Sequence, residues 1–239
     1  MRQEGLARLS SVHLKKNRSD YIVMYYLIED LKTAIGKYAN GQVLDIGCGN
    51  KPYEQLFANK ATGYVGCDVV QSDKNKVDVI CEATKLNFPD AQFDTVFSTQ
   101  VIEHVNDPFK MMQEANRVLK QDGLVIVSAP FTWELHEEPY DFYRYSKYGL
   151  KAMFEQKGFE VLEIKANGGK WAAIFQMNIN MVYSTFKKKR LLVKLLKGLF
   201  INLHFTALLN RIAIWVDKKY HDELLTLNYV IIARKIKNV

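Results

Sequence analysis

The stretch VLDIGCGNKPY, residues 43–53, decides the fold. It contains an apolar run that ends at Ile46, then Gly47 and Gly49 one residue apart, and then Pro52. Glycines in a turn after a strand let backbone N–H groups approach a ligand closely. Pro52 predicts a helix start, whose N-terminus would add partial positive charge. The stretch therefore predicts a ligand-binding turn at the carboxyl end of a strand, although an isolated Gly-x-Gly would be no more than a tight turn.

The residues around the glycines narrow the ligand class. A Walker phosphate loop needs Gly-Lys-Ser/Thr after a longer loop, and that pattern is absent. A dinucleotide-binding turn needs a third glycine, but the positions after Gly49 hold Lys51 and Pro52. Asp45 lies two residues before Gly47, where a carboxylate repels a pyrophosphate and attracts an ammonium or sulfonium group. The turn thus favours a cationic ligand.

Segments typical of strands and of helices alternate along the chain, which predicts an α/β fold with a parallel, helix-covered sheet. We expect strands at 42–46, 63–67, 77–81, 93–98, 124–129, 159–166 and 227–236. We expect helices at 21–39, 52–59, 107–120 and 146–157.

Several segments resemble, in order, those of the class I S-adenosylmethionine-dependent methyltransferases. Asp45-x-Gly47-x-Gly49 is similar to the family's motif I. Asp68 lies 19 residues after Gly49, where the family places an acid on the ribose hydroxyls. Glu82-Ala83 stands where the family has Asp-Ala at the adenine edge, and residues 88–130 resemble the type 11 methyltransferases. The resemblance covers about residues 40–166 and the last strand.

This resemblance implies a Rossmann-like sheet of seven strands in the order 3-2-1-4-5-7-6, with the last strand antiparallel. It implies S-adenosyl-L-methionine as the cofactor and S-adenosyl-L-homocysteine as the product. No spacing of His, Asp or Glu suggests a metal site, so we expect no metal. The cofactor-binding residues implied are Asp45, Gly47, Cys48, Gly49, Asp68, Val69, Glu82, Ala83, Gln100 and Val101.

The acceptor is expected at residues 129–146, APFTWELHEEPYDFYRYS, because this loop leaves the ligand-binding edge of the sheet. The loop resembles an H-x-x-P-x-D-F-x-R-Y pattern of some type 11 relatives. One interpretation is a substrate-facing lid with His136 and Asp141 as catalytic candidates. The other is a structural loop in which Asp141 pairs with Arg144. Further candidates on the substrate side are His104, Phe131, Arg144 and Tyr145.

We expect a single methyltransferase domain in four parts. These are an N-terminal helical segment at 1–40, a cofactor-binding core at 41–167, a helical insertion or cap at 168–226 and the last strand at 227–239. The charge is uneven, because residues 187–239 carry 12 Lys/Arg against 3 Asp/Glu, whereas residues 1–186 carry 21 against 23. The basic character therefore belongs to the C-terminal quarter.

Residues 190–203, RLLVKLLKGLFINL, place their leucines on one side of a helix and their cations on the other. A second apolar helix is expected at 207–216. One interpretation is attachment to an anionic membrane surface through residues 187–215. The alternatives are a helical cap on the sheet or a dimer interface, so the oligomeric state stays open. Nucleic acid is not expected, because no stacking aromatics are interleaved with the basic run at 187–190.

Composition and missing motifs limit the remaining possibilities. Cys48, Cys67 and Cys81 form no C-x-x-C pair, and no apolar segment has signal-peptide or membrane-spanning length. We therefore expect a cytoplasmic protein, with peripheral attachment to a membrane as an option.

No G-x-S-x-G and no [DNS]-P-P-[FYW] pattern occurs. We expect methylation, at oxygen, of a small-molecule, lipid-linked or saccharide-containing acceptor. The alternatives are a non-catalytic cofactor-binding scaffold and an RNA-directed methyltransferase.

Overall fold

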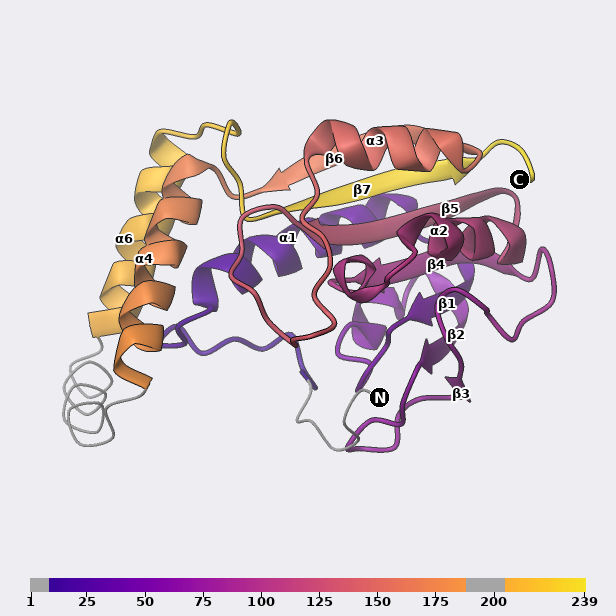
Figure 1. Cartoon of the computed structure of the whole chain (residues 1–239), viewed down its shortest axis with the longest axis horizontal. Coiled ribbons are helices and arrows are strands. Elements are labelled where there is room, and N and C mark those ends of the chain that lie inside the picture. The colour runs from indigo at the N-terminus through magenta and orange to yellow at the C-terminus, as the bar shows by residue number, and fades with distance from the viewer. Residues whose placement is uncertain (1–8, 188–204) are drawn as a thin grey trace. The chain divides into compact units, whose positions relative to one another are not determined.

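The structure is a computed structural model that describes residues 9–187 and 205–239 (Figure 1). The chain divides into two compact units. Of the described residues, the first unit comprises 9–12, 30–165 and 229–239, and the second comprises 13–29, 166–187 and 205–228. That the whole chain is a single domain stays a prediction.

Seven strands form one sheet in the order β3-β2-β1-β4-β5-β7-β6, as the resemblance implied. The pairs β1–β2, β2–β3, β1–β4 and β4–β5 are parallel, and the sheet is mixed, with one antiparallel strand. The strands are β1 (Gly41–Ile46), β2 (Ala61–Asp68), β3 (Val79–Ile80), β4 (Phe93–Thr99), β5 (Leu119–Pro130), β6 (Phe159–Asn167) and β7 (Asn228–Lys235).

The central strands are apolar because neighbouring strands and helices cover them on both faces. Val43 and Leu44 of β1 and Val96 of β4 are fully buried, as are Val125 and Ile126 of β5. The chain winds outward in opposite directions from β1 and β4. In open parallel sheets, such a reversal leaves a crevice beyond the carboxyl ends of the two strands, and ligands bind there.

Two helices of the first unit begin directly after a residue whose side chain caps them. Asp107 precedes α2 (Pro108–Val118), and its Oδ1 accepts a 2.9 Å hydrogen bond from the Lys110 N–H. Ser146 precedes α3 (Lys147–Gln156), and its hydroxyl oxygen accepts one from the Gly149 N–H. A longer helix, α1 (Tyr21–Tyr38), lies where one was expected.

Some predicted boundaries are wrong. The helix expected at 52–59 is only a 3₁₀ turn, η1 (Glu54–Phe57), because no side chain caps its start and Lys51 has a positive φ of 52°. A proline alone therefore does not start an α-helix here. The predicted helix at 107–120 ends at Val118, and β5 begins at once because Leu119 pairs with Phe93. Strand β3 is limited to Val79–Ile80.

The second unit contains α4 (Lys170–Lys187) and α6 (Phe205–Lys219), joined by buried polar contacts. Asp217 of α6 accepts hydrogen bonds from the backbone of Gly169 and Ala172, at the start of α4. The buried Gln176 of α4 accepts one from the Val23 N–H. The basic helix expected at 190–203 lies outside the described residues. Among the described helices, none has the length and hydropathy needed to cross a membrane.

Candidate active site

A cavity of about 1150 Å³ opens at the carboxyl ends of β1, β2 and β4. It lies where the reversal of strand order predicts a ligand site. Of the ten predicted cofactor-binding residues, six line it: Gly47, Asp68, Val69, Glu82, Ala83 and Val101. The cavity is also lined by residues that were not predicted to bind the cofactor or the acceptor, namely Ile46, Cys67, Val70, Cys81, Thr84, Val105, Asn106, Asp107, Lys110 and Tyr140.

The glycine turn has no room for a side chain at its first glycine. Gly47 has a φ of 76°, and a Cβ atom there would lie 2.3 Å from Cγ2 of Val101. The N–H groups of Gly47 and Cys48 both donate to the carbonyl oxygen of Cys67, at 2.8 and 3.0 Å. The turn is therefore fixed to the end of β2, and its backbone forms part of the cavity wall.

Asp68 connects the end of β2 to the same turn. The side chain is buried, and its Oδ2 accepts a 3.1 Å hydrogen bond from the Gly49 N–H. Its Oδ1 accepts another, at 2.8 Å, from the Val69 N–H. These bonds orient the carboxylate at the cavity wall. A contact between Asp68 and ribose hydroxyls stays a prediction.

Asp45 lies deeper than the sequence suggested. It is buried in β1 and is not among the described residues that line the cavity. Its Oδ2 accepts a 2.6 Å hydrogen bond from the Tyr64 hydroxyl. Burial raises the pKa of Asp45 to about 7, although the bond from Tyr64 acts in the opposite direction. Cys48, Gly49 and Gln100 are likewise not lining residues, and Nε2 of Gln100 donates to the Ser128 hydroxyl.

The cysteines differ from one another more than the sequence suggested. Cys48 is buried, whereas Cys67 and the half-buried Cys81 line the cavity. Cys81 follows β3, and its N–H donates to the Asp68 carbonyl at 3.0 Å. The thiols of Cys67 and Cys81 share a hydrogen bond, which lowers the pKa of Cys81 and raises that of Cys67. Two of the three thiols are therefore part of the site.

The loop after β5 is held together by Arg144. Its guanidinium donates to both carboxylate oxygens of Asp141, each at 2.7 Å. It also donates to the carbonyl oxygens of Trp133, Glu134 and Tyr143. Arg144 holds the pKa of Asp141 well below its usual range. The ion pair between Asp141 and Arg144, expected for a structural loop, is therefore observed. A role of Arg144 toward the substrate stays a prediction.

This loop is also fixed to the 3₁₀ turn η2 (Ile102–His104) after β4. The Phe142 N–H donates to the Glu103 carbonyl at 2.9 Å, and the Tyr145 hydroxyl donates to the Ile102 carbonyl at 3.1 Å. Burial raises the pKa of Tyr145 above its usual range. Phe131 contacts Tyr229, with ring centroids 5.7 Å apart. Neither Tyr145 nor Phe131 is among the described lining residues.

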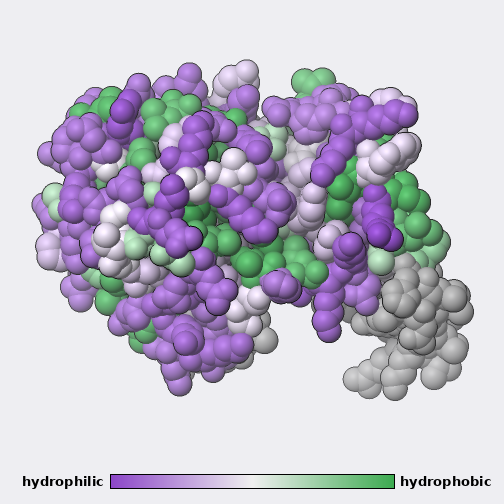
Figure 2. Space-filling view, turned by 180° about the vertical axis from the view of Figure 1, so that it is seen from behind, coloured by the Kyte–Doolittle hydropathy of each residue, from purple (hydrophilic) through white to green (hydrophobic). Residues whose placement is uncertain are grey.

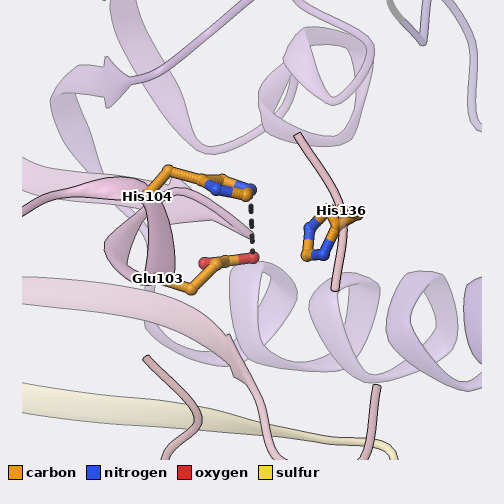
Figure 3. A group of neighbouring side chains, drawn as sticks. All are labelled: Glu103, His104 and His136. Carbon is orange, nitrogen blue, oxygen red and sulfur yellow. Dashed lines mark ion pairs between the residues drawn. The ribbon is translucent and has the colours of Figure 1, made fainter. Parts of the chain in front are cut away.

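The loop brings His136 to Glu103 and His104 (Figure 3). The rings of His104 and His136 meet edge to face, with centroids 4.7 Å apart. His104 lines the cavity, whereas His136 is not among the described residues that line it. Glu103 is fully buried, and burial raises its pKa to about 8. Its burial was not predictable, because the polar pair Glu103-His104 gives no local sign of being covered by the loop that follows β5.

Comparison with known proteins agrees with this geometry. Residues 44–127 match a family model described as a methyltransferase domain, of type 11. A ubiquinone biosynthesis O-methyltransferase from Ruegeria sp. (strain TM1040) is 30% identical over 126 residues, which cover 46% of this chain and 51% of that protein. The chain thus spans about half the length of this curated relative.

Two solved structures share the fold. The [4+2]-cyclase SpnF superposes with a TM-score of 0.57 at 19% identity, covering 88% of this chain and 80% of the other. Phosphoethanolamine N-methyltransferase 2 of Haemonchus contortus, in complex with S-adenosyl-L-methionine, superposes with a TM-score of 0.54 at 19% identity. That match covers 87% of this chain and 53% of the other.

Strand order, cavity and motif order together define a class I S-adenosylmethionine-dependent methyltransferase fold. Within that class, residues 44–127 match the methyltransferase domain family of type 11.

Proposed function

We propose that the protein transfers the methyl group of S-adenosylmethionine to an oxygen of a small-molecule, lipid-linked or saccharide-containing acceptor. The observation that carries this proposal is the cavity itself, because all its lining residues except Tyr140 lie within the family-matched segment, Gly47, Asp68 and Glu82 among them. The Ruegeria relative, an O-methyltransferase by name, supports the choice of oxygen.

The lining fits such a cofactor. The Gly47 backbone can approach the ligand closely, Asp68 presents an oriented carboxylate for ribose hydroxyls, and Glu82 with Ala83 would meet the adenine. The lining acids favour a cation over a phosphate group. A cavity of about 1150 Å³ also exceeds the few hundred Å³ that many single ligands need, so an acceptor has room beside the cofactor.

When bound, S-adenosylmethionine supplies an electrophilic methyl group on a sulfonium. A hydroxyl acceptor must lose its proton as the new carbon–oxygen bond forms and the carbon–sulfur bond breaks. The imidazole pair His104 and His136 would receive that proton, with His104 facing the cavity and Asp141 positioning His136. The backbone N–H of His136 donates to Oδ2 of Asp141 at 2.9 Å.

Two measurements test the proposal. Isothermal titration measures the affinity for S-adenosylmethionine, and a labelled-methyl assay on lipid and saccharide fractions of a cell extract measures transfer. Asp68→Ala should weaken binding by at least about tenfold, because it removes a charged hydrogen-bond acceptor worth about 1.5–3 kcal/mol. Glu155→Ala is the control, since Glu155 is an exposed acid on α3. Tight binding without transfer to any fraction would favour a scaffold, and absence of binding would contradict both.

We further propose that the protein meets an anionic membrane surface through residues 187–215. What supports this is a row of exposed apolar residues on α6, namely Phe205, Leu208, Ile212 and Trp215, at helical spacings of three and four. Arg211, Lys218 and Lys219 are exposed on the same helix. Figure 2 shows hydrophobic residues at the surface of this helix pair.

Co-sedimentation with phosphatidylserine-containing vesicles at low salt tests the membrane proposal. Ile212→Ser and Trp215→Ser should each reduce the bound fraction, because each removes a large apolar group from the helix face. Leu224→Ser is the matched control, since Leu224 is an even more exposed apolar residue outside α6. Failure of the wild-type protein to sediment with the vesicles would overturn the proposal.

A further inference from the structure

Glu103, His104 and His136 form a cluster whose ligand atoms lie within 4.8 Å of one another. Figure 3 shows the carboxylate and the two rings directed toward a common point. Nε2 of His104 lies 3.8 Å from Oε1 of Glu103. Neither carboxylate oxygen of the fully buried Glu103 accepts a hydrogen bond from any described residue. A buried polar group left in this state is costly unless something else binds it.

Both imidazoles are oriented through their other nitrogen. Nδ1 of His104 lies 2.6 Å from the Tyr140 carbonyl oxygen, and Nδ1 of His136 lies 3.2 Å from the Glu134 carbonyl oxygen. A carbonyl oxygen only accepts, so each Nδ1 carries a proton, and the neutral form of each ring then has its lone pair on Nε2. Nδ1 of His136 also lies 3.3 Å from Oδ2 of Asp141. Metal-binding histidines are usually oriented in this way, by a carbonyl or carboxylate on the second nitrogen.

We propose that Glu103, His104 and His136 bind one divalent transition-metal ion of the Zn²⁺ type at the edge of the cavity. Two imidazoles and one carboxylate match the ligand set of catalytic zinc sites, which keep a fourth position open. Bonds of 2.0–2.1 Å in tetrahedral geometry need ligand atoms about 3.4 Å apart. The three ligand atoms therefore have to move slightly closer together when the ion binds.

The sequence predicts no metal because the three ligands come from two distant segments. Glu103 and His104 are adjacent in η2, and His136 comes from the loop after β5. No local spacing of residues indicates such a site. The hydrogen bond from the Phe142 N–H to the Glu103 carbonyl holds these two segments together.

A metal at this position would lie beside the cavity, because His104 and Tyr140 line it. Its role toward the acceptor rests on the proposed methyl transfer, whereas its binding does not. With both Nε2 lone pairs coordinated, neither ring would be the base. The metal would instead lower the pKa of a bound acceptor hydroxyl, whose proton would leave to water.

Isothermal titration of the chelator-treated full chain with Zn²⁺ tests the proposal, and titration with Mg²⁺ provides the comparison. We expect one Zn²⁺ per chain and much weaker binding of Mg²⁺, which prefers oxygen ligands. His136→Ala should weaken Zn²⁺ binding by at least about 100-fold, since loss of a mere second-shell partner already costs 10- to 100-fold. Glu103→Gln should also weaken it, and thermal melting shows that each variant is folded.

Two control variants distinguish Zn²⁺ binding at this cluster from Zn²⁺ binding at other residues. His221→Ala should leave Zn²⁺ binding unchanged, although His221 also lies near two carboxylates, those of Asp217 and Glu223. Cys81→Ser should leave it unchanged as well, and the Co²⁺ protein should lack a thiolate charge-transfer band. Absence of stoichiometric Zn²⁺ binding would overturn the proposal, as would binding that Cys81→Ser abolishes and His136→Ala spares. Zn²⁺ binding without methyl transfer would leave the site standing and contradict only the proposed function.

Discussion

The hydroxyl of Tyr64 donates a 2.6 Å hydrogen bond to Oδ2 of Asp45, across the parallel pair β1–β2. The acid that precedes the glycine turn is therefore held inside the sheet. Burial raises its pKa from an ordinary 3.8 to about 7. Since the charged form is disfavoured in the folded state, Asp45 makes stability depend on pH.

The direction of this pH dependence follows from the pKa of Asp45 in the unfolded state and in the folded state. The folded state binds the proton more tightly than the unfolded state, so the stabilisation is fully present below pH 3.8. It is lost as the pH rises to about 7. The full change is on the order of 4 kcal/mol. Relative to Asp45→Asn, which does not titrate, the wild-type protein should lose free energy of unfolding across this range.

Urea denaturation of both proteins at pH 4, 5.5 and 7.5 measures this difference. A difference that stays constant across the three pH values would contradict the raised pKa of Asp45. Repeating the denaturation with S-adenosylmethionine bound adds a further test. A nearby cation should favour the charged carboxylate of Asp45 and so reduce the pH dependence of the free energy of unfolding.

Gly47→Ala should destabilise the protein and weaken cofactor binding. The substitution places a Cβ 2.3 Å from the Val101 side chain, in a backbone conformation with a φ of 76°. Strain of this kind costs on the order of 1–3 kcal/mol. Calorimetry measures the melting temperature, and isothermal titration measures the affinity for S-adenosylmethionine.

Gly36→Ala is the matched control for Gly47→Ala. Gly36 lies in α1, and a Cβ there meets nothing within 4 Å. Because alanine favours a helix, this variant should be as stable as the wild type or more so, by about 0.5–1 kcal/mol. Equal losses in the two variants would mean that the crowding at Val101 is not the cause.

The sheet was predictable because its strands are long apolar runs, and the order followed from the resemblance. The helix expected at 52–59 was wrong because the sequence shows Pro52 but not the missing cap at Tyr53. The helices expected at 107–120 and 146–157 are present, and Asp107 and Ser146 both cap them through their side chains. The end of the first lies at Val118 because the pairing of Leu119 with Phe93 is not visible in the local sequence.

The site was predictable only where its residues are close in sequence. Gly47 was found from the glycine turn and Asp68 from the resemblance to the family, whereas the neighbourhood of His136 and Glu103 exists only in the folded chain. The depth of Asp45 also depends on Tyr64, which lies on the neighbouring strand. The negative charge of Asp45 indicated a cationic ligand, but it could not show that the carboxylate of Asp45 is buried.

Cys81 should be the first thiol to react with an alkylating reagent. It is the half-buried cysteine of the three, and its hydrogen bond with Cys67 lowers its pKa. Because Cys81 lines the cavity, S-adenosylmethionine should slow its labelling. Mass spectrometry of timed samples identifies the labelled residue. The buried Cys48, whose pKa burial raises, serves as the internal reference, and faster labelling of Cys48 would contradict the prediction.

Arg144→Lys should loosen the loop between β5 and α3 while leaving the sheet intact. Arg144 makes five hydrogen bonds, two to Asp141 and three to backbone carbonyls of the same loop. Lysine has three donors and cannot hold both oxygens of a carboxylate in a planar pair. Hydrogen exchange should therefore increase at residues 131–146.

The exposed pair between Arg234 and Glu160 provides the control for Arg144. Nη2 of Arg234 lies 2.6 Å from Oε2 of Glu160, and both side chains are about half exposed. Exposed pairs contribute little, so Arg234→Lys should change the free energy of unfolding by less than about 1 kcal/mol and leave exchange in the loop unchanged. If Arg144→Lys leaves exchange unchanged as well, the loop is held by its tethers to η2, the Phe142 and Tyr145 hydrogen bonds, and not by the guanidinium.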